Sequence, residues 1–89
     1  MVRITVSSPL RRFCNQEDVL DGCGETVIQV ILDATRKYPE LRRKVLKSKT
    51  EIHSQILVYR NGNMIPRPRE TVTIGADTEL NLLLIVGGG

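Results

Sequence analysis

The stretch that decides the fold is Leu80-Asn81-Leu82-Leu83-Leu84-Ile85-Val86, which is followed by Gly87-Gly88-Gly89. Such a run is so apolar that it is typical of a strand in the centre of a sheet. It is also far too short to cross a bilayer. At the other end of the sequence, Val2, Ile4 and Val6 alternate with polar residues, which predicts a first strand with one buried face. We expect the first and last strands to pair side by side in parallel.

A helix is predicted between these strands. Thr26, with Gln29 three residues later, forms a capping-box pattern directly after a glycine-rich break. From Val27 the apolar residues then fall at one-face helical spacing as far as Tyr38. Pro39 ends this helix or kinks it, and residues 40–46 are expected to form a short basic helix with Leu41 and Val45 inward.

The remaining segments predict shorter strands. A second strand, antiparallel to the first, is expected at residues 17–20, and residues 56–59 form another that turns at Asn61-Gly62-Asn63 into Met64-Ile65. Residues 7–9 and 47–54 are interpreted as loops, Pro66 and Pro68 confine their stretch to an edge or loop, and Val72 and Ile74 suggest a short strand or half-turn. The fold class is therefore α+β, with one mixed sheet of four to five strands crossed by one main helix.

Composition sets the scale of the domain and the chemistry it excludes. The chain has 89 residues, 40% hydrophobic and 3% aromatic, which predicts one small domain with an aliphatic core. Its N-terminus lacks the layout of a secretory signal, so we expect a cytoplasmic protein with Cys14 and Cys23 as reduced thiols. These two cysteines and the single His53 match no metal-ligand spacing.

Charge is unevenly distributed. Residues 36–49 carry seven Lys and Arg side chains against Glu40, a net charge of +6, whereas the remaining residues sum to −3 within an overall +3. Nucleic-acid binding is not favoured, because the basic stretch lacks the interleaved aromatic residues that stack on bases. Steering toward an acidic partner is the alternative use of this polarity.

The three final glycines are the most informative feature for function. A tail without side chains can thread a narrow channel and present its carboxylate inside another protein. Strand alternation that turns Leu80 and Leu82 toward the helix turns Leu83 and Ile85 to the opposite face, either as an apolar docking patch or as residues buried under a loop. The tail could otherwise be an unstructured end or a remnant of cloning.

Four segments carry a resemblance to a known family, namely residues 3–6, Gly24-Glu25-Thr26-Val27, Tyr59-Arg60-Asn61-Gly62 and residues 80–89. Together they resemble the ubiquitin-like β-grasp sulfur carriers, the family of the thiamin sulfur carrier and the molybdopterin synthase small subunit. The resemblance implies a β-grasp domain over residues 1–86 and a flexible glycine tail over residues 87–89. The tail departs from the family pattern, because family tails often carry proline and alanine where residues 84–87 are Leu-Ile-Val-Gly. This departure leaves the partner enzyme open.

The resemblance also implies a function. The Gly89 carboxylate would be adenylated by an activating (adenylyltransferase) enzyme and converted to a thiocarboxylate that donates sulfur in biosynthesis of a cofactor, amino acid or secondary metabolite. The partner enzyme would supply ATP and Mg²⁺, a sulfurtransferase would act as sulfur donor and a synthase would accept the sulfur, while the chain itself binds no cofactor or metal and is no enzyme. The residues expected to contact partners are Leu83, Ile85, Val86, Gly87 and Gly88.

Three alternatives stay open beside the carrier. The chain could be a permanent small subunit of the molybdopterin synthase type, a ubiquitin-like modifier attached to protein lysines, or a non-catalytic interaction module in which the tail does no chemistry. An independent enzyme is not favoured, because no nucleophile stands at recognisable spacing from a base and an orienting group.

Overall fold

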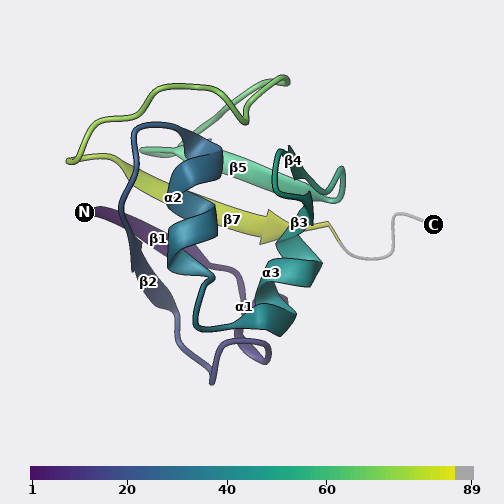
Figure 1. Ribbon diagram of the computed structural model, residues 1–89. Coiled ribbons are helices and arrows are strands. Elements are labelled where there is room, and N and C mark those ends of the chain that lie inside the picture. The colour runs from purple at the N-terminus through teal and green to yellow at the C-terminus, as the bar shows by residue number, and fades with distance from the viewer. Residues whose placement is uncertain (86–89) are drawn as a thin grey trace.

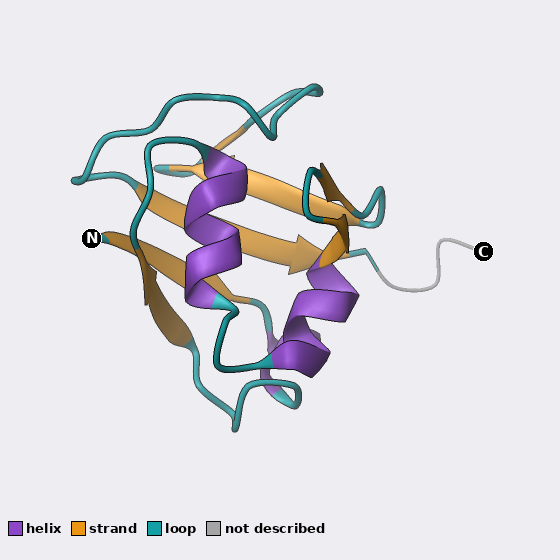
Figure 2. Ribbon diagram, viewed as in Figure 1, coloured by secondary structure: helices purple, strands orange, loops and turns teal. Residues whose placement is uncertain are grey.

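The computed structural model describes residues 1–85 and arranges them as one sheet crossed by a helix, with a small second sheet at one end (Figure 1). The main sheet has five strands in the order β2-β1-β7-β5-β6, the small one pairs β3 with β4, and α2 lies across one face of the main sheet (Figure 2). The strands are β1 Val2–Val6, β2 Val19–Gly22, β3 Leu46–Ser48, β4 Glu51–Ile52, β5 Ile56–Arg60, β6 Asn63–Met64 and β7 Glu79–Leu84. The helices are α1 Ser8–Arg11, α2 Val27–Ala34 and α3 Pro39–Val45.

Strand β7 occupies the centre of the main sheet, as its apolar sequence predicts. It pairs in parallel with β1, Ile4 opposite Leu80, and antiparallel with β5, Val58 opposite Leu82. The strand begins at Glu79 and ends at Leu84 rather than running from residue 80 to residue 86. The predicted parallel pairing is thus confirmed, and the predicted Val86 lies outside the described residues.

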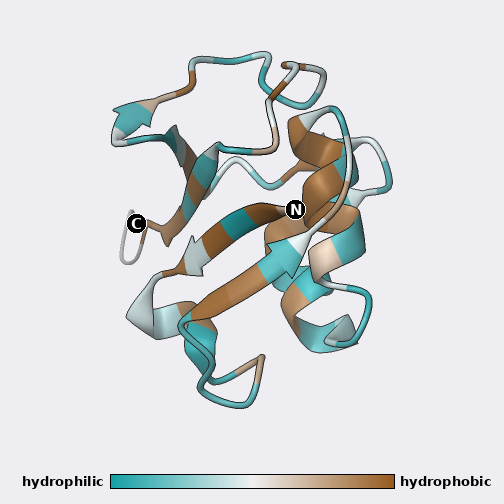
Figure 3. Cartoon of the chain, turned by 90° about the vertical axis from the view of Figure 1, so that its left-hand side faces the viewer, coloured by the Kyte–Doolittle hydropathy of each residue, from teal (hydrophilic) through white to brown (hydrophobic). Residues whose placement is uncertain are grey.

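The core lies between α2 and the main sheet. Val27, Val30 and Ile31 of α2 are fully buried against the inward residues of β1, β5 and β7. Long stretches of the helices and of the central strands are hydrophobic, whereas most of the loops are hydrophilic (Figure 3). Each such aliphatic side chain contributes about 1.5–3 kcal/mol when it is removed from water. Aliphatic residues and Cys14 therefore make up the buried core, with no fully buried aromatic residue among residues 1–85.

Helix α2 begins as predicted and ends earlier. Thr26 Oγ1 accepts the N–H of Gln29 at 3.4 Å, while the Gln29 side chain accepts the N–H of Glu25 rather than that of Thr26, a variant of the expected capping box. The helix stops at Ala34 instead of Tyr38. The hydroxyl of Thr35 donates a hydrogen bond to the carbonyl of Ile31. In addition, Tyr38 precedes Pro39, and the helical conformation is disfavoured for a residue before a proline.

The basic segment after Pro39 forms α3, as predicted, with Leu41 and Val45 fully buried. The loop predicted at residues 47–54 is wrong in part, because β3 and β4 pair there with Leu46 opposite Ile52. Both of these side chains are buried. The sequence has no local periodicity that predicts this pairing, because only polar residues lie between Leu46 and Ile52.

Two further boundaries differ from the sequence prediction. Strand β2 lies at residues 19–22 rather than 17–20, because Gly22 pairs with Val2. Residues 8–11 form the short helix α1 instead of a loop, since Pro9 is compatible with a first helical turn and Leu10 enters the core.

The predicted hairpin between β5 and β6 is confirmed. Arg60 pairs with Asn63, and the two intervening residues, Asn61 and Gly62, have φ of 49° and 89°. Two positive φ angles are what a two-residue type I′ turn requires.

At residues 72–74 the chain forms an isolated bridge between Thr73 and Thr26. None of the helices within residues 1–85 has the length and apolar character needed to span a membrane.

Candidate functional site

The end of β7 leads the chain toward the predicted reactive glycines. The N–H of Ile85 donates to the carbonyl of Gln55 at 2.8 Å, which ties the strand end to the residues just before β5. The predicted tail residues Gly87, Gly88 and Gly89 and the predicted contact residue Val86 lie outside the described residues. Their roles stay predictions.

The alternation of β7 separates core side chains from exposed ones. Leu80 and Leu82 are 0% and 1% exposed, whereas Leu83 and Ile85 are 41% and 43% exposed. Leu83 pairs with Leu57 across the sheet, so the two side chains share the face that α2 does not cover. The predicted orientation of Leu83 and Ile85 is confirmed, and the alternative in which a loop buries them is wrong. Whether they dock on a partner stays a prediction.

The same open face continues into a polar row beside Leu83. Asn81 stands between Tyr59 of β5 and Thr5 of β1, and its side-chain amide donates to the Thr5 hydroxyl. A shallow hollow of about 320 Å³ lies over these residues and is bordered by Leu83. Met64, 53% exposed, pairs with Tyr59 at the sheet edge. The face therefore offers an apolar strip beside a hydrogen-bonding row.

The basic segment concentrates its charge around the end of α3. Arg42, Arg43, Lys47 and Lys49 line one hollow of about 320 Å³, whose other lining residues carry no charge. Basic side chains near a helix C-terminus also interact favourably with the helix dipole. This surface can attract an acidic partner, as the charge pattern predicts.

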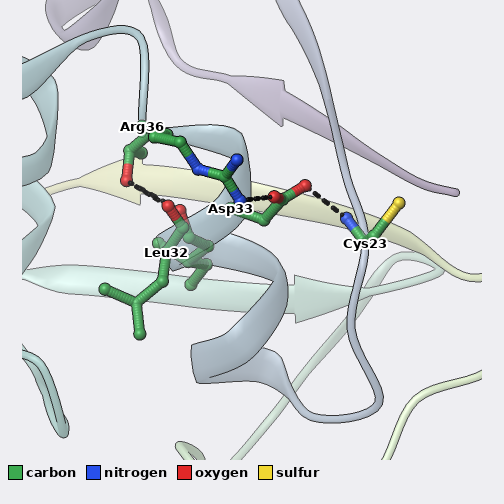
Figure 4. A network of polar contacts seen from close by, with 6 residues as sticks. Cys23, Leu32, Asp33 and Arg36 are labelled. Carbon is green, nitrogen blue, oxygen red and sulfur yellow. Dashed lines mark hydrogen bonds and ion pairs between the residues drawn. The ribbon is translucent and has the colours of Figure 1, made fainter.

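The cysteines occupy different environments. Cys14 is fully buried, and burial raises the pKa of its thiol above the usual value even though the hydrogen bond to the Glu17 carbonyl acts in the opposite direction. Cys23 is exposed in the loop before α2, where its N–H donates to Asp33 and Asp33 forms an ion pair with Arg36 (Figure 4). A raised pKa makes Cys14 a poor nucleophile. Among residues 1–85 no three His, Cys, Asp or Glu side chains gather where they could hold a metal ion.

A charged cluster next to the end of β7 escaped the sequence analysis. Arg69 is only 2% exposed, and its guanidinium donates to the carbonyl of His53 at 2.9 Å. Arg67 donates to the next carbonyl, that of Ser54, at 2.6 Å. The only signal in the sequence is the alternation of prolines and arginines at residues 66–69, which says nothing about burial.

Glu70 completes this cluster. Burial raises the pKa of its carboxyl, but the hydrogen bonds from the N–H groups of Ile52 and Arg69 and the positive charge of Arg69 outweigh burial, so the pKa lies below its usual value. Each carboxylate oxygen accepts one backbone N–H, at 3.0 Å from Ile52 and 3.3 Å from Arg69. Glu70 therefore fastens β4 to the loop that carries the arginines.

Comparison with known proteins gives a family and a set of similar structures. Residues 4–89 match the ThiS family. CysO of Mycobacterium tuberculosis is similar over 97% of this chain and 100% of its own, with 18% identity and a TM-score of 0.82. A chain of the Amycolatopsis orientalis BexX/CysO complex is similar over 100% of both chains, with 22% identity and a TM-score of 0.85. No curated protein matches the sequence.

A third similar structure is that of an archaeal modifier. Small archaeal modifier protein 1 of Methanosarcina acetivorans is 26% identical, with 99% of this chain and 95% of that chain covered and a TM-score of 0.85. The predicted fold class is confirmed by these likenesses together with the sheet order and the crossing helix. The match over nearly the whole length, on this fold, establishes that the chain belongs to the ThiS family and has the ubiquitin-like β-grasp fold of its sulfur carriers and modifiers.

Proposed function

We propose that the chain is a sulfur carrier whose Gly89 carboxylate is the reacting group. The observation that carries this proposal is the ThiS family match, which extends through residue 89 and so includes the glycine tail. A central strand that leads directly into that tail gives the reacting end a rigid base. The chain would act as a cosubstrate and contribute no acid, base or metal of its own.

The chemistry requires a partner enzyme. A carboxylate oxygen of Gly89 would attack the α-phosphate of ATP and expel pyrophosphate, with Mg²⁺ and the activating enzyme stabilising the charge that develops. A sulfur donor, either sulfide or the persulfide of a sulfurtransferase, would then attack the acyl carbon and expel AMP. Sulfide would leave a thiocarboxylate directly, whereas a persulfide would leave an acyl disulfide, which a second thiol would reduce to release the thiocarboxylate and leave a disulfide on the donor. A downstream synthase would accept the sulfur.

Docking would use the open face of the sheet near the strand end. Leu83 and Ile85 are exposed apolar side chains directly before the tail, and exposed apolar residues of this kind mark protein contacts when they cluster. The BexX/CysO complex, named for two proteins, supports the idea that a protein of this fold assembles with a partner protein. In this account Gly87 and Gly88 keep the tail thin enough to enter the partner.

The first test is intact mass spectrometry of the purified protein after incubation with the activating enzyme of its host, ATP and a sulfide source. The expected result is a mass gain equal to the replacement of one oxygen by sulfur, mapped to Gly89 by fragmentation. A variant that lacks Gly88 and Gly89 is the control and should gain nothing. A terminus that stays an unmodified carboxylate would overturn the carrier.

Docking is tested by Leu83→Ser. We expect this variant to fold normally, because the side chain is already 41% exposed, and to raise the KM for the carrier about tenfold through lost apolar contact. Met64→Ser is the matched control and should leave the KM unchanged, because Met64, although exposed and apolar on the same face, lies on the edge strand β6, which β5 separates from β7. An equal KM for Leu83→Ser and the unchanged protein would remove Leu83 from the interface.

A ubiquitin-like modifier is the second candidate, because small archaeal modifier protein 1 of Methanosarcina acetivorans is 26% identical to this chain over nearly its whole length. In that case the same activated carboxylate would form an isopeptide bond with protein lysines. A ladder of conjugates in host lysate, lost when the terminal glycines are removed, would favour the modifier over the carrier.

A further inference from the structure

Arg69 is a buried cation whose charge the neighbouring Glu70 offsets only in part. Arginine stays charged in proteins, and a buried charge is costly unless it is paired. Yet its guanidinium makes one hydrogen bond among residues 1–85, to the His53 carbonyl, and the only ion pair within that range joins Arg36 to Asp33 near the end of α2. The remaining N–H groups of Arg69 have no acceptor among these residues, and because no fully buried side-chain nitrogen there lacks a partner, they must reach solvent or a ligand.

A second guanidinium, that of Arg67, adds to the positive charge beside Arg69. Arg67 and Arg69 are held on the consecutive carbonyls of Ser54 and His53, so two like charges lie side by side. Burial, and then the charge of Arg67, lower the pKa of Arg69 and together outweigh the charge of Glu70, which raises it. An anion between the two groups would relieve this repulsion and accept the unused N–H donors, which are arranged for oxyanions.

A cavity is present where such an anion would bind. It measures about 450 Å³ and is lined by both arginines together with Lys47, Glu51 and Glu70. Glu70 is already engaged, because its two oxygens accept the N–H groups of Ile52 and Arg69. Three cations and two anions leave the lining with one positive charge, which matches a single carboxylate better than a doubly charged phosphate.

The cavity lies at the end of the molecule where β7 stops. His53 and Ser54 line it, and the following residue, Gln55, accepts the N–H of Ile85. Figure 1 likewise places β3 and β4 at the end of the sheet where β7 ends. A protein that binds the chain beyond Ile85 would therefore lie close to the two arginines.

We propose that Arg67 and Arg69 form an oxyanion site that takes a carboxylate side chain of the protein docking at this end of the sheet. That the occupant belongs to the docking partner rests on the proposed function, whereas carboxylate binding by the isolated chain does not. The arginine pair would act as an anchor beside the apolar contact of Leu83 and Ile85.

The site is tested first on the isolated protein by NMR titration. The Nε and Cζ resonances of the arginines are followed as N-acetylglutamate amide, N-acetylglutamine amide or inorganic phosphate is added. We expect saturable shifts at Arg67 and Arg69 with the glutamate probe and none with the neutral glutamine probe. Arginines that only clamp residues 53 and 54 to the loop would show no saturable shift, and that result would overturn the site.

Variants then locate the binding group. Arg67→Gln should keep the fold, because Arg67 is exposed, and should raise the Kd for the glutamate probe about threefold or more. Arg3→Gln, at an exposed arginine of β1, is the matched control and should leave the Kd unchanged. Equal effects of the two variants would contradict the site. Phosphate that saturates at a concentration about tenfold lower than the glutamate probe would overturn the carboxylate assignment in favour of a free phosphate.

The partner is tested with the activating enzyme. Arg67→Gln should raise the KM for the carrier about threefold or more with kcat unchanged, and Arg3→Gln should change neither. A KM unaffected by Arg67→Gln would overturn the partner assignment alone. If the enzyme does not adenylate the unchanged chain, the proposed function and the partner assignment fail together, and the probe titration still decides the site.

Discussion

At the scale of single residues, Gly22 is the position where β2 touches α2. A Cβ atom built on Gly22 would lie 2.4 Å from the carbonyl oxygen of Val30 and 3.1 Å from Ala34 Cβ. Because the nearest atom is backbone, the helix would have to move. We expect Gly22→Ala to lower the free energy of unfolding by about 2 kcal/mol or more.

Urea unfolding of the purified variants measures this effect. Gly75→Ala is the matched control, because its nearest atom is the Thr78 hydroxyl at 4.0 Å and the change should stay within about 0.5 kcal/mol. Similar losses for both variants would mean that the contact between β2 and α2 can relax.

Glu70 predicts a pH dependence of stability. Its pKa is lower in the folded chain than in the unfolded one, so the ionised carboxylate stabilises the fold above its ordinary pKa, and this contribution is lost as the pH falls through the folded pKa. Glu70→Gln should cost about 1–2 kcal/mol at neutral pH, from weakened hydrogen bonds to the Ile52 and Arg69 N–H groups, and much less in acid.

Urea unfolding at about pH 7 and about pH 3 checks the sign. Glu25→Gln, at an exposed carboxyl in the loop before α2, should change the stability little at either pH. A cost of Glu70→Gln that is the same at both pH values would show that the charge of Glu70 is not what stabilises the loop.

At the scale of elements, the start of α2 depends on a long capping bond. Thr26 Oγ1 lies 3.4 Å from the N of Gln29, so Thr26→Ala should destabilise the chain by about 0.5–1 kcal/mol, the lower part of the range for N-caps. Thermal melting is the measurement, with Thr71→Ala at an exposed position as control. A variant as stable as the control would mean that packing alone fixes the helix start.

How far an element could be predicted depends on whether its signal is local. The helical spacing after Thr26 and the apolar run of β7 are local, and both elements were predicted within a few residues. The pairing of β3 with β4 joins Leu46 to Ile52 without periodicity, so residues 47–54 were interpreted as a loop. The buried side chain of Arg69 donates to the carbonyl of His53, and no pattern in the sequence predicts that these two residues meet.

At the scale of the whole molecule, the charge is polarised, with net +6 in residues 36–49. If the activating enzyme presents an acidic surface, the association rate should fall as the ionic strength rises, because screening weakens steering. Stopped-flow binding over about 0.05–0.5 M salt measures the slope. The double variant Arg43→Gln, Lys49→Gln should flatten it, and a response that is already flat in the unchanged protein would contradict steering.

The parallel pairing of β1 with β7 has a mechanical consequence. The start of β1 and the end of β7 lie at opposite ends of two neighbouring strands, Arg3 opposite Glu79 and Val6 opposite Leu82. A force that pulls on the chain beyond Ile85 while the N-terminal end is held would load these hydrogen bonds together, in shear, instead of opening them one after another. A partner that pulls on the C-terminal end therefore applies force along the direction in which the sheet resists it most. The folded domain can then keep its structure while the partner acts on that end.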